Sequence, residues 1–226
     1  MSLEAWNVCK SLGKPPHEII HKASFKIQAG EFVSLRGRSG SGKSTLLYLL
    51  STLDAPTSGE VLYFGKNVNH MSPQELRILR NQNLGFIFQF HYLLPELTAL
   101  ENVLMPARKT GAHLVKKDYA RSLLEKFDLK DHMNHRPREL SGGQSQRVAV
   151  ARALIMEPQF IFADEPTGSL DTQNSEKVFE IFQRINSDMK TTIVMVTHDE
   201  EFSRRAHRII ELVDGRVVRD LESGAQ

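Results

Sequence analysis

The stretch "EFVSLRGRSGSGKSTLLYLL", residues 31–50, decides the fold class of this 226-residue chain. It begins with an apolar run typical of a buried strand, passes through a glycine-rich loop, and ends in a run with helical spacing. Residues 37–44 match the pattern G-x-x-x-x-G-K-[ST], which requires a strand before it and a helix after it. A chance glycine-rich turn is the alternative, but it explains neither the apolar strand before the loop nor the helix after it. The sequence therefore predicts a phosphate-binding loop in an α/β protein.

The residue types in this loop suit a nucleoside triphosphate and Mg²⁺. Glycines let backbone N–H groups wrap around phosphates. Lys43 would neutralise the β- and γ-phosphates, and the Ser44 hydroxyl would ligate Mg²⁺, which prefers oxygen ligands. The predicted nucleotide-binding residues of the loop are Gly37, Arg38, Ser39, Gly40, Ser41, Gly42, Lys43, Ser44 and Thr45.

The segment "FIFADE", residues 160–165, supplies two carboxylates after a short apolar run. A parallel strand of this kind places them at its carboxyl end, where α/β sheets bind ligands. We expect Asp164 to hold Mg²⁺ through water and Glu165 to polarise the attacking water as general base. A solvated acidic pair in a turn is the alternative. The phosphate loop elsewhere in the chain favours the catalytic interpretation.

The remaining pattern predicts an α/β core with an inserted helical region. Residues 23–37 indicate two strands joined at Ala29-Gly30, residues 44–53 a helix, and residues 84–89 and 191–199 buried parallel strands. Hairpins are predicted at residues 59–68 and 208–218. Residues 90–150 lack strand signals, and helical spacing occurs at residues 99–107 and 116–129.

A second feature, "LSGGQ" at residues 140–144, stands before an apolar, alanine-rich run. This is typical of a helix start, where backbone N–H groups and the helix dipole favour an anion. No strand leads into it and no Lys-Ser pair closes it, so it is not a second phosphate loop. A single domain thus carries two candidate anion sites.

Composition excludes several classes of protein. The net charge of +2 gives no strong field for nucleic acid, so no nucleic-acid partner is expected. The single cysteine, Cys9, cannot form an internal disulfide and fits a reducing compartment. The N-terminus has no apolar segment typical of a signal peptide, and the apolar runs are too short to span a bilayer. We therefore expect a cytoplasmic protein whose membrane spans, if it uses any, belong to another chain.

These motifs, in this order, resemble the ATP-binding subunits of ABC transporters, over nearly the whole chain. The resemblance implies one domain, residues 1–226, with an α/β P-loop NTPase (RecA-like) core, a small antiparallel β subdomain, and a helical insertion at about residues 90–150 that carries the signature motif. It identifies Gln89 as a catalytic glutamine and Mg²⁺ ligand and His198 as the switch histidine. The implied reaction is hydrolysis of ATP with Mg²⁺.

The resemblance also explains the second anion site. Members of this family form head-to-tail homodimers in which the signature of one chain caps the γ-phosphate on the loop of the other. Asp171 of the "GSLD" segment would lie across that interface. The residues expected to act on the partner's nucleotide are Ser141, Gly142, Gly143 and Gln144.

Residues 80–107 and 134–143 are similar to the ATPase of the lipoprotein-releasing complex of Gram-negative bacteria. That similarity implies a peripheral protein on the cytoplasmic face of the inner membrane, with integral membrane permease subunits docking near residues 89–103. An amphipathic core helix and loop is the alternative for that segment. Macrolide-exporter and cell-division ATPases share much of the pattern and remain alternatives.

Other functional classes fit the sequence less well. Soluble ABC ATPases of DNA repair carry a long coiled coil between the two nucleotide motifs, and this chain has no heptad run. Those of translation usually carry two cassettes, and a P-loop kinase or switch protein has no signature. One position departs from the family: Leu12 stands where an aromatic residue usually stacks on adenine, with Trp6 nearby. His132 and His135 have the spacing of a metal pair but no evident third ligand, so we interpret them as loop residues.

Overall fold

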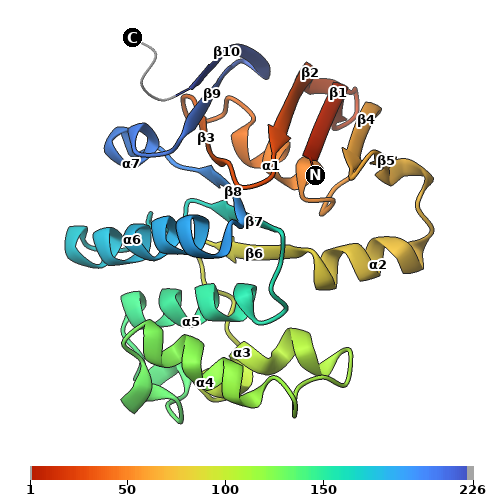
Figure 1. Ribbon diagram of the computed structural model, residues 1–226. Coiled ribbons are helices and arrows are strands. Elements are labelled where there is room, and N and C mark those ends of the chain that lie inside the picture. The colour runs from red at the N-terminus through yellow and green to blue at the C-terminus, as the bar shows by residue number, and fades with distance from the viewer. Residues whose placement is uncertain (1, 223–226) are drawn as a thin grey trace.

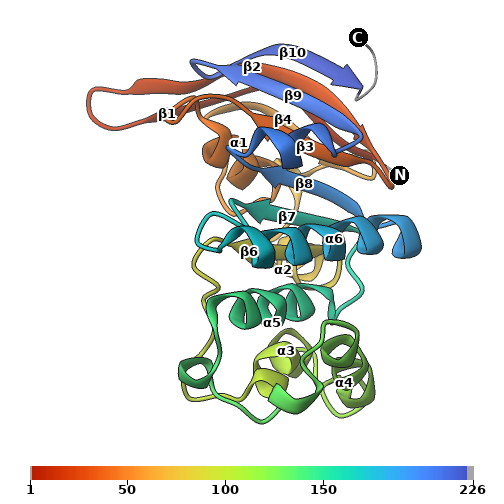
Figure 2. The ribbon, with the colours of Figure 1, turned by 90° about the vertical axis from the view of Figure 1, so that its left-hand side faces the viewer.

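The computed structural model describes residues 2–222 and contains two β-sheets with helices around and between them (Figure 1). The smaller sheet is antiparallel, in the order β2-β1-β4-β5. Its strands are β1 (Ser2–Leu12), β2 (His17–Gln28), β4 (Ser58–Tyr63) and β5 (Lys66–Asn67). The β1–β2 hairpin reaches beyond the neighbouring strands (Figure 2).

The larger sheet has six strands in the order β10-β9-β3-β8-β7-β6. Four of its strands pair in parallel, with β6 at the edge opposite β10, and are short and apolar, as expected for parallel strands. They are β3 (Phe32–Arg36), β6 (Leu84–Phe88), β7 (Phe160–Asp164) and β8 (Thr192–Val196). At one edge β9 (Arg208–Val213) and β10 (Arg216–Glu222) form an antiparallel hairpin. The predicted parallel strands and both hairpins are confirmed.

Two hydrophobic cores lie on opposite faces of the six-stranded sheet. The first contains the buried leucines of α1 (Lys43–Leu50), packed between the antiparallel sheet and one face of the larger sheet. The second contains α5 (Gly142–Leu154) and α6 (Thr172–Met189), packed against the other face. The helix that follows the phosphate loop and the helix that follows "LSGGQ" therefore belong to different layers (Figure 2).

The helical region forms the end of the molecule opposite the antiparallel sheet (Figure 1). It contains α3 (Ala99–Arg108) and α4 (Lys117–Lys126), close to the predicted helices, and the 3₁₀ turns η2 (Lys130–His132) and η3 (Pro137–Glu139). Asn102 on α3 is fully buried and ties the helix to the preceding loop through bonds with Leu94, Leu97 and Thr98.

Three further elements complete the fold. These are α2 (Pro73–Gln82), α7 (Glu200–Arg204) and the 3₁₀ turn η1 (Val68–His70). Sequence analysis gave no bounds for α2, α6 or the strand β1. No helix within residues 2–222 is long and apolar enough to cross a bilayer.

Candidate functional site

The phosphate loop follows β3 and runs into α1, and its backbone path requires glycine at two positions. Gly42 has φ 94°, and a Cβ there would lie 2.7 Å from Ile20 Cδ1. Gly37 has φ 155°, and a Cβ would lie 2.2 Å from the carbonyl oxygen of Leu212. The loop is thus packed tightly between the start of β2 and the end of β9, with no room for side chains at these points.

Lys43 lies inside the curl of the loop. Its Nζ donates to the carbonyl oxygens of Gly37 and Arg38, both at 2.9 Å, and the residue is only 8% exposed. Within residues 2–222 this ammonium has no ion-pair partner. A nearly buried cation held only by carbonyl groups leaves its charge uncompensated, which suits an arriving phosphate.

Asp164 ends β7 and meets the first turn of α1. Ser44 Oγ donates to its Oδ1 at 2.8 Å, and the Tyr48 hydroxyl donates to its Oδ2 at 2.8 Å. Burial, and then the bond to Asp164, raises the pKa of Tyr48 to about 12. A serine hydroxyl beside a carboxylate is an oxygen donor set that fits Mg²⁺. Sequence analysis missed Tyr48, although its spacing of four residues from Ser44 places both on one helix face.

Glu165 lies directly after Asp164 and is paired with His198, which follows β8. His198 Nδ1 lies 2.7 Å from Glu165 Oε2, and the His198 backbone N–H donates to the same oxygen at 3.3 Å. The Glu165 N–H donates to the carbonyl oxygen of Val196 at 3.0 Å. Glu165 has φ 46°, a left-handed backbone that a non-glycine residue adopts at a cost of about 1–3 kcal/mol. The end of the neighbouring strand therefore holds this carboxylate in place.

Gln89 follows β6 and lies beside the turn that leads away from Glu165. A Cβ on Gly168 would lie 3.0 Å from Gln89 Nε2, and Ser169 Oγ donates to the Gln89 carbonyl oxygen at 3.3 Å. The structure thus brings Gln89 to the edge that carries Asp164. It records no bond between the Gln89 side chain and Asp164 or Ser44 in the described residues.

The segment "LSGGQ" forms the capped start of α5, as predicted. Ser141 Oγ accepts from the Gln144 N–H at 3.2 Å, and Gln144 Oε1 accepts from the Ser141 N–H at 2.8 Å. A Cβ on Gly143 would lie 2.4 Å from Asn174 Oδ1, so a larger residue here would displace the Asn174 side chain at the start of α6. The structure also places Gln144 Nε2 2.9 Å from His132 Nε2, a contact that sequence analysis missed.

Asp171 caps the start of α6, close to the signature helix. Its carboxylate accepts from the Asn174 N–H at 2.8 Å and from Asn174 Nδ2 at 2.7 Å. These bonds hold the pKa of Asp171 below its usual value. The turn from Thr167 and the start of α6 line a hollow of about 720 Å³ that also includes His198.

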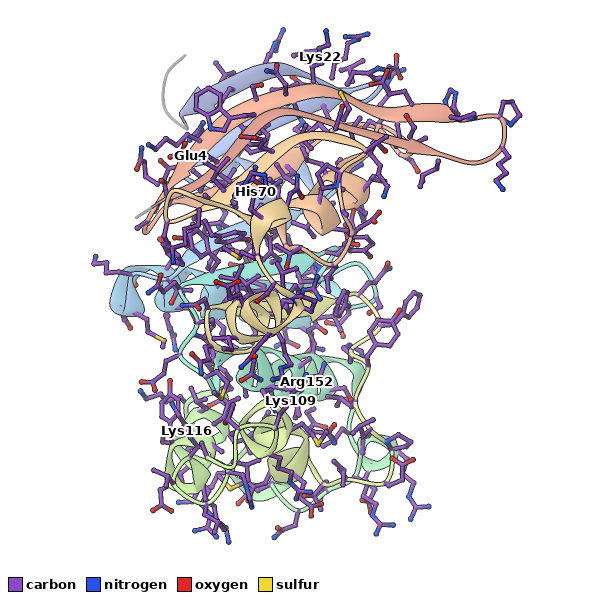
Figure 3. The ribbon with its side chains drawn as sticks, turned by 90° about the vertical axis from the view of Figure 1, so that its right-hand side faces the viewer. Glu4, Lys22, His70, Lys109, Lys116 and Arg152 are labelled. Atoms are coloured by element: carbon purple, nitrogen blue, oxygen red, sulfur yellow. The ribbon has the colours of Figure 1, made fainter. Side chains whose placement is uncertain are left out.

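The segment after Gln89 is held to α5 by Arg152. Its guanidinium donates to the carbonyl oxygens of His91 and Tyr92, each at 2.6 Å. Arg152 lies where the sheet meets the helical region (Figure 3). The aromatic side chains of this segment stay outside: Phe90 is 66% exposed and Tyr92 is 64% exposed.

The histidine pair of the helical region shows no metal site. The rings of His132 and His135 lie 5.0 Å apart in an edge-to-face arrangement. Residues 2–222 contain no group of three or more His, Cys, Asp or Glu side chains that could hold a metal ion.

Comparisons with known proteins agree with this geometry. The sequence model of the ABC transporter family matches residues 20–168, so the chain belongs to that family as an ATP-binding, ATP-hydrolysing domain. It is 57% identical to the lipoprotein-releasing system ATP-binding protein LolD of Leptospira interrogans, over 89% of this chain and 85% of that protein. It is 52% identical to the protein of that name from Aquifex aeolicus, over 91% of this chain and 92% of that protein.

Solved structures show the same fold. A dimeric ATP-binding cassette in a post-hydrolysis state, bound to ADP and Pi, superposes with a TM-score of 0.88 at 38% identity. A dimeric bacterial ABC transporter cassette gives a TM-score of 0.89 at 38% identity. Each covers 99% of this chain and 100% of the compared chain. The predicted P-loop core with an antiparallel β subdomain and a helical insertion is confirmed.

Proposed function

We propose that this chain is the ATPase subunit of a transporter that releases lipoproteins from the inner membrane. The observation that carries the ATPase site is the meeting of Ser44, Asp164, Glu165 and His198 at one edge of the sheet, beside Lys43. The similarity to lipoprotein-releasing ATPases over about nine-tenths of the chain supports the transport role. ATPases of macrolide exporters and cell-division complexes share the fold and are the alternatives.

Each residue at the edge has a distinct role in the proposed reaction. The loop amides of residues 37–45 and Lys43 bind the phosphates, and Ser44 and Asp164 hold Mg²⁺, with Gln89 completing its surroundings. A bound Mg²⁺ neutralises charge on the β- and γ-phosphates. Glu165 takes the proton of the attacking water, and His198 keeps that carboxylate aimed at the site.

The signature acts on the nucleotide of a second copy in this proposal. The two anion sites of one chain lie in different layers, because α1 and α5 pack in separate cores on opposite faces of the sheet. No contact between residues 140–144 and the phosphate loop of the same chain is recorded within the described residues. Oriented N–H groups at a helix start stabilise transition-state charge. In a head-to-tail homodimer, residues 141–144 and Asp171 therefore complete the partner's site.

Residues 89–103 form the proposed docking segment for the permease subunits. Its exposed aromatic side chains, Phe90 and Tyr92, offer apolar contact area. Its backbone is held rigidly by Arg152 and by the fully buried Asn102. A fixed backbone that presents exposed aromatics suits a protein partner, since little ordering entropy is lost on binding. The chain would then sit on the cytoplasmic face of the membrane.

The test distinguishes the proposed cargo from the assignment of ATPase activity. Tagged chain is purified from native membranes with its integral membrane subunits, and the complex is placed in vesicles that contain a triacylated protein. We expect ATP-dependent release of that protein to a soluble acceptor, and none from the Glu165→Gln complex. Hydrolysis of ATP without any release would reject the cargo and leave the ATPase assignment standing.

A further inference from the structure

Tyr48 has no role in the mechanism described so far, yet its hydroxyl lies 2.8 Å from Asp164 Oδ2. Ser44 Oγ donates a hydrogen bond to the other carboxylate oxygen of Asp164, Oδ1, also at 2.8 Å. The two donors stand four residues apart on α1, so they reach across from one helix face to the end of β7. Both oxygens of Asp164 are thereby fixed by a single element.

The orientation of this carboxylate matters because the torsion about its Cβ–Cγ bond is broad and has no strong intrinsic preference. A donor at one oxygen only would leave the group free to swing. A donor at each oxygen fixes both the plane of the carboxylate and the oxygen that faces Ser44. A metal ion would bind Ser44 through a lone pair of Oγ, so the Ser44 hydroxyl keeps its hydrogen for Oδ1 and Tyr48 is the donor that holds Oδ2.

We propose that Tyr48 is a positioning residue for the magnesium site: it holds Asp164 by Oδ2 so that Oδ1 stays directed at Ser44 and the bound ion. This inference rests on the magnesium site proposed above. It predicts that Tyr48 affects the binding of the metal and leaves the metal-free binding of nucleotide unchanged. Loss of such a supporting partner typically weakens metal affinity by about 10- to 100-fold.

The test compares Tyr48→Phe with wild type and with a matched control. Tyr63→Phe also removes one tyrosine hydroxyl bond, to the Leu50 carbonyl oxygen at 2.6 Å, from the core next to α1 and away from Asp164. Binding of a fluorescent ATP analogue is measured in EDTA and then as a function of Mg²⁺. We expect Tyr48→Phe to raise the Mg²⁺ concentration at half-saturation roughly 10- to 100-fold, with wild-type affinity in EDTA. Tyr63→Phe keeps the wild-type Mg²⁺ dependence.

A second readout is the turnover rate against Mg²⁺ concentration. If Tyr48 acts by positioning, kcat of Tyr48→Phe returns toward the wild-type value when Mg²⁺ saturates the site. An unchanged Mg²⁺ dependence, or a loss of affinity in EDTA as large as that in Mg²⁺, would overturn the proposal. If wild type itself bound ATP equally well with and without Mg²⁺, the proposal of the magnesium site would be rejected. That result differs from one that rejects only the positioning role of Tyr48.

Discussion

The imidazole of His198 lies 2.7 Å from the carboxylate of Glu165, and the two residues follow neighbouring parallel strands of the sheet. The pair is formed by strand ends, so its geometry is set by the pairing of β7 with β8. Glu165 is mostly covered, with its side chain 20% exposed, whereas His198 is 71% exposed. The histidine is therefore the member of the pair that a nucleotide or a second copy of the chain reaches first.

The first prediction concerns Glu165→Gln. We expect this variant to bind ATP and to hydrolyse it about 10²- to 10⁴-fold more slowly, because it lacks the general base. Gln has nearly the shape of Glu, so the site should still close, and the variant should accumulate as a dimer in ATP. Turnover and size in solution are measured with ATP present. Hydrolysis near the wild-type rate would remove Glu165 from the role of base.

Lys43→Ala tests the phosphate loop. Its ammonium makes two bonds of 2.9 Å to loop carbonyl oxygens and carries the charge expected to face the β- and γ-phosphates. Hydrogen bonds to charged groups are worth about 1.5–3 kcal/mol, which corresponds to a roughly 10- to 150-fold loss of ATP affinity. Equilibrium binding of ATP measures this loss of affinity, with the surface variant Lys109→Ala as control. Equal affinity of both variants would contradict the role of the loop.

Asn102→Ala tests how the docking segment is held. The Asn102 side chain is fully buried and bonds to Leu94, Leu97 and Thr98. Removing it leaves backbone groups without partners, and we expect the free energy of unfolding to fall by about 1–3 kcal/mol. Urea denaturation checks this against Asn134→Ala, an exposed position where about 0.5 kcal/mol or less is expected. Equal stability of the two variants would show that the bonds do not anchor the segment.

The strands that carry the site could be predicted because each is a short apolar run that ends in a polar residue. The contact between Ser44 and Asp164 followed from the motifs, although the residues are far apart in the chain. The extent of β1 was not predicted because irregularities between Ala5 and Ser11 break its alternation. The helix α2 was missed despite its capping box at Ser72 and Glu75, since it is mostly polar and Leu79 is its one buried residue.

The site residues outside the motifs were harder to predict, for a different physical reason. Tyr48 contacts Asp164 and His132 contacts Gln144, and only the tertiary structure brings these pairs close. A tyrosine on a buried helix is most often a core residue, so its spacing alone did not separate the two roles. The direction of a side chain depends on how its helix packs against other elements. Residues far away in the chain determine that packing, so the local sequence does not reveal it.

The split site predicts complementation between chains. Ser141→Arg blocks the signature and Lys43→Ala disables the phosphate loop, so each homodimer has two defective sites. A mixed dimer has one site with both defects and one with neither, and mixing should restore part of the hydrolysis. Turnover is measured at several mixing ratios against each variant alone. No recovery at any ratio, with mixed dimers shown to form, would favour a signature that serves its own chain or a dimer that needs both sites intact.

The last prediction concerns how the protein binds the adenine base of the nucleotide. Leu12 ends β1, and its partner across the hairpin is His17. Ile20, which pairs with Lys10 two residues before Leu12, packs where a Cβ on Gly42 would go. Trp6 lies six residues earlier, which is about 20 Å along a strand, so the end of β1 is the better placed of the two to meet a base. Leu12 is 49% exposed and offers no π-face.

Stacking of an aromatic ring on a base is worth about 1–3 kcal/mol. We therefore expect wild type to discriminate weakly between ATP and GTP, and Leu12→Tyr to tighten ATP binding by roughly 5- to 150-fold. Dissociation constants for both nucleotides measure this, with Leu114→Tyr in the helical region as control, because Leu114 is 74% exposed and lies in a different part of the fold. Strong preference for ATP in wild type, together with no gain from Leu12→Tyr, would mean that another group holds the base. Trp6→Leu would then identify that group by its loss of ATP affinity.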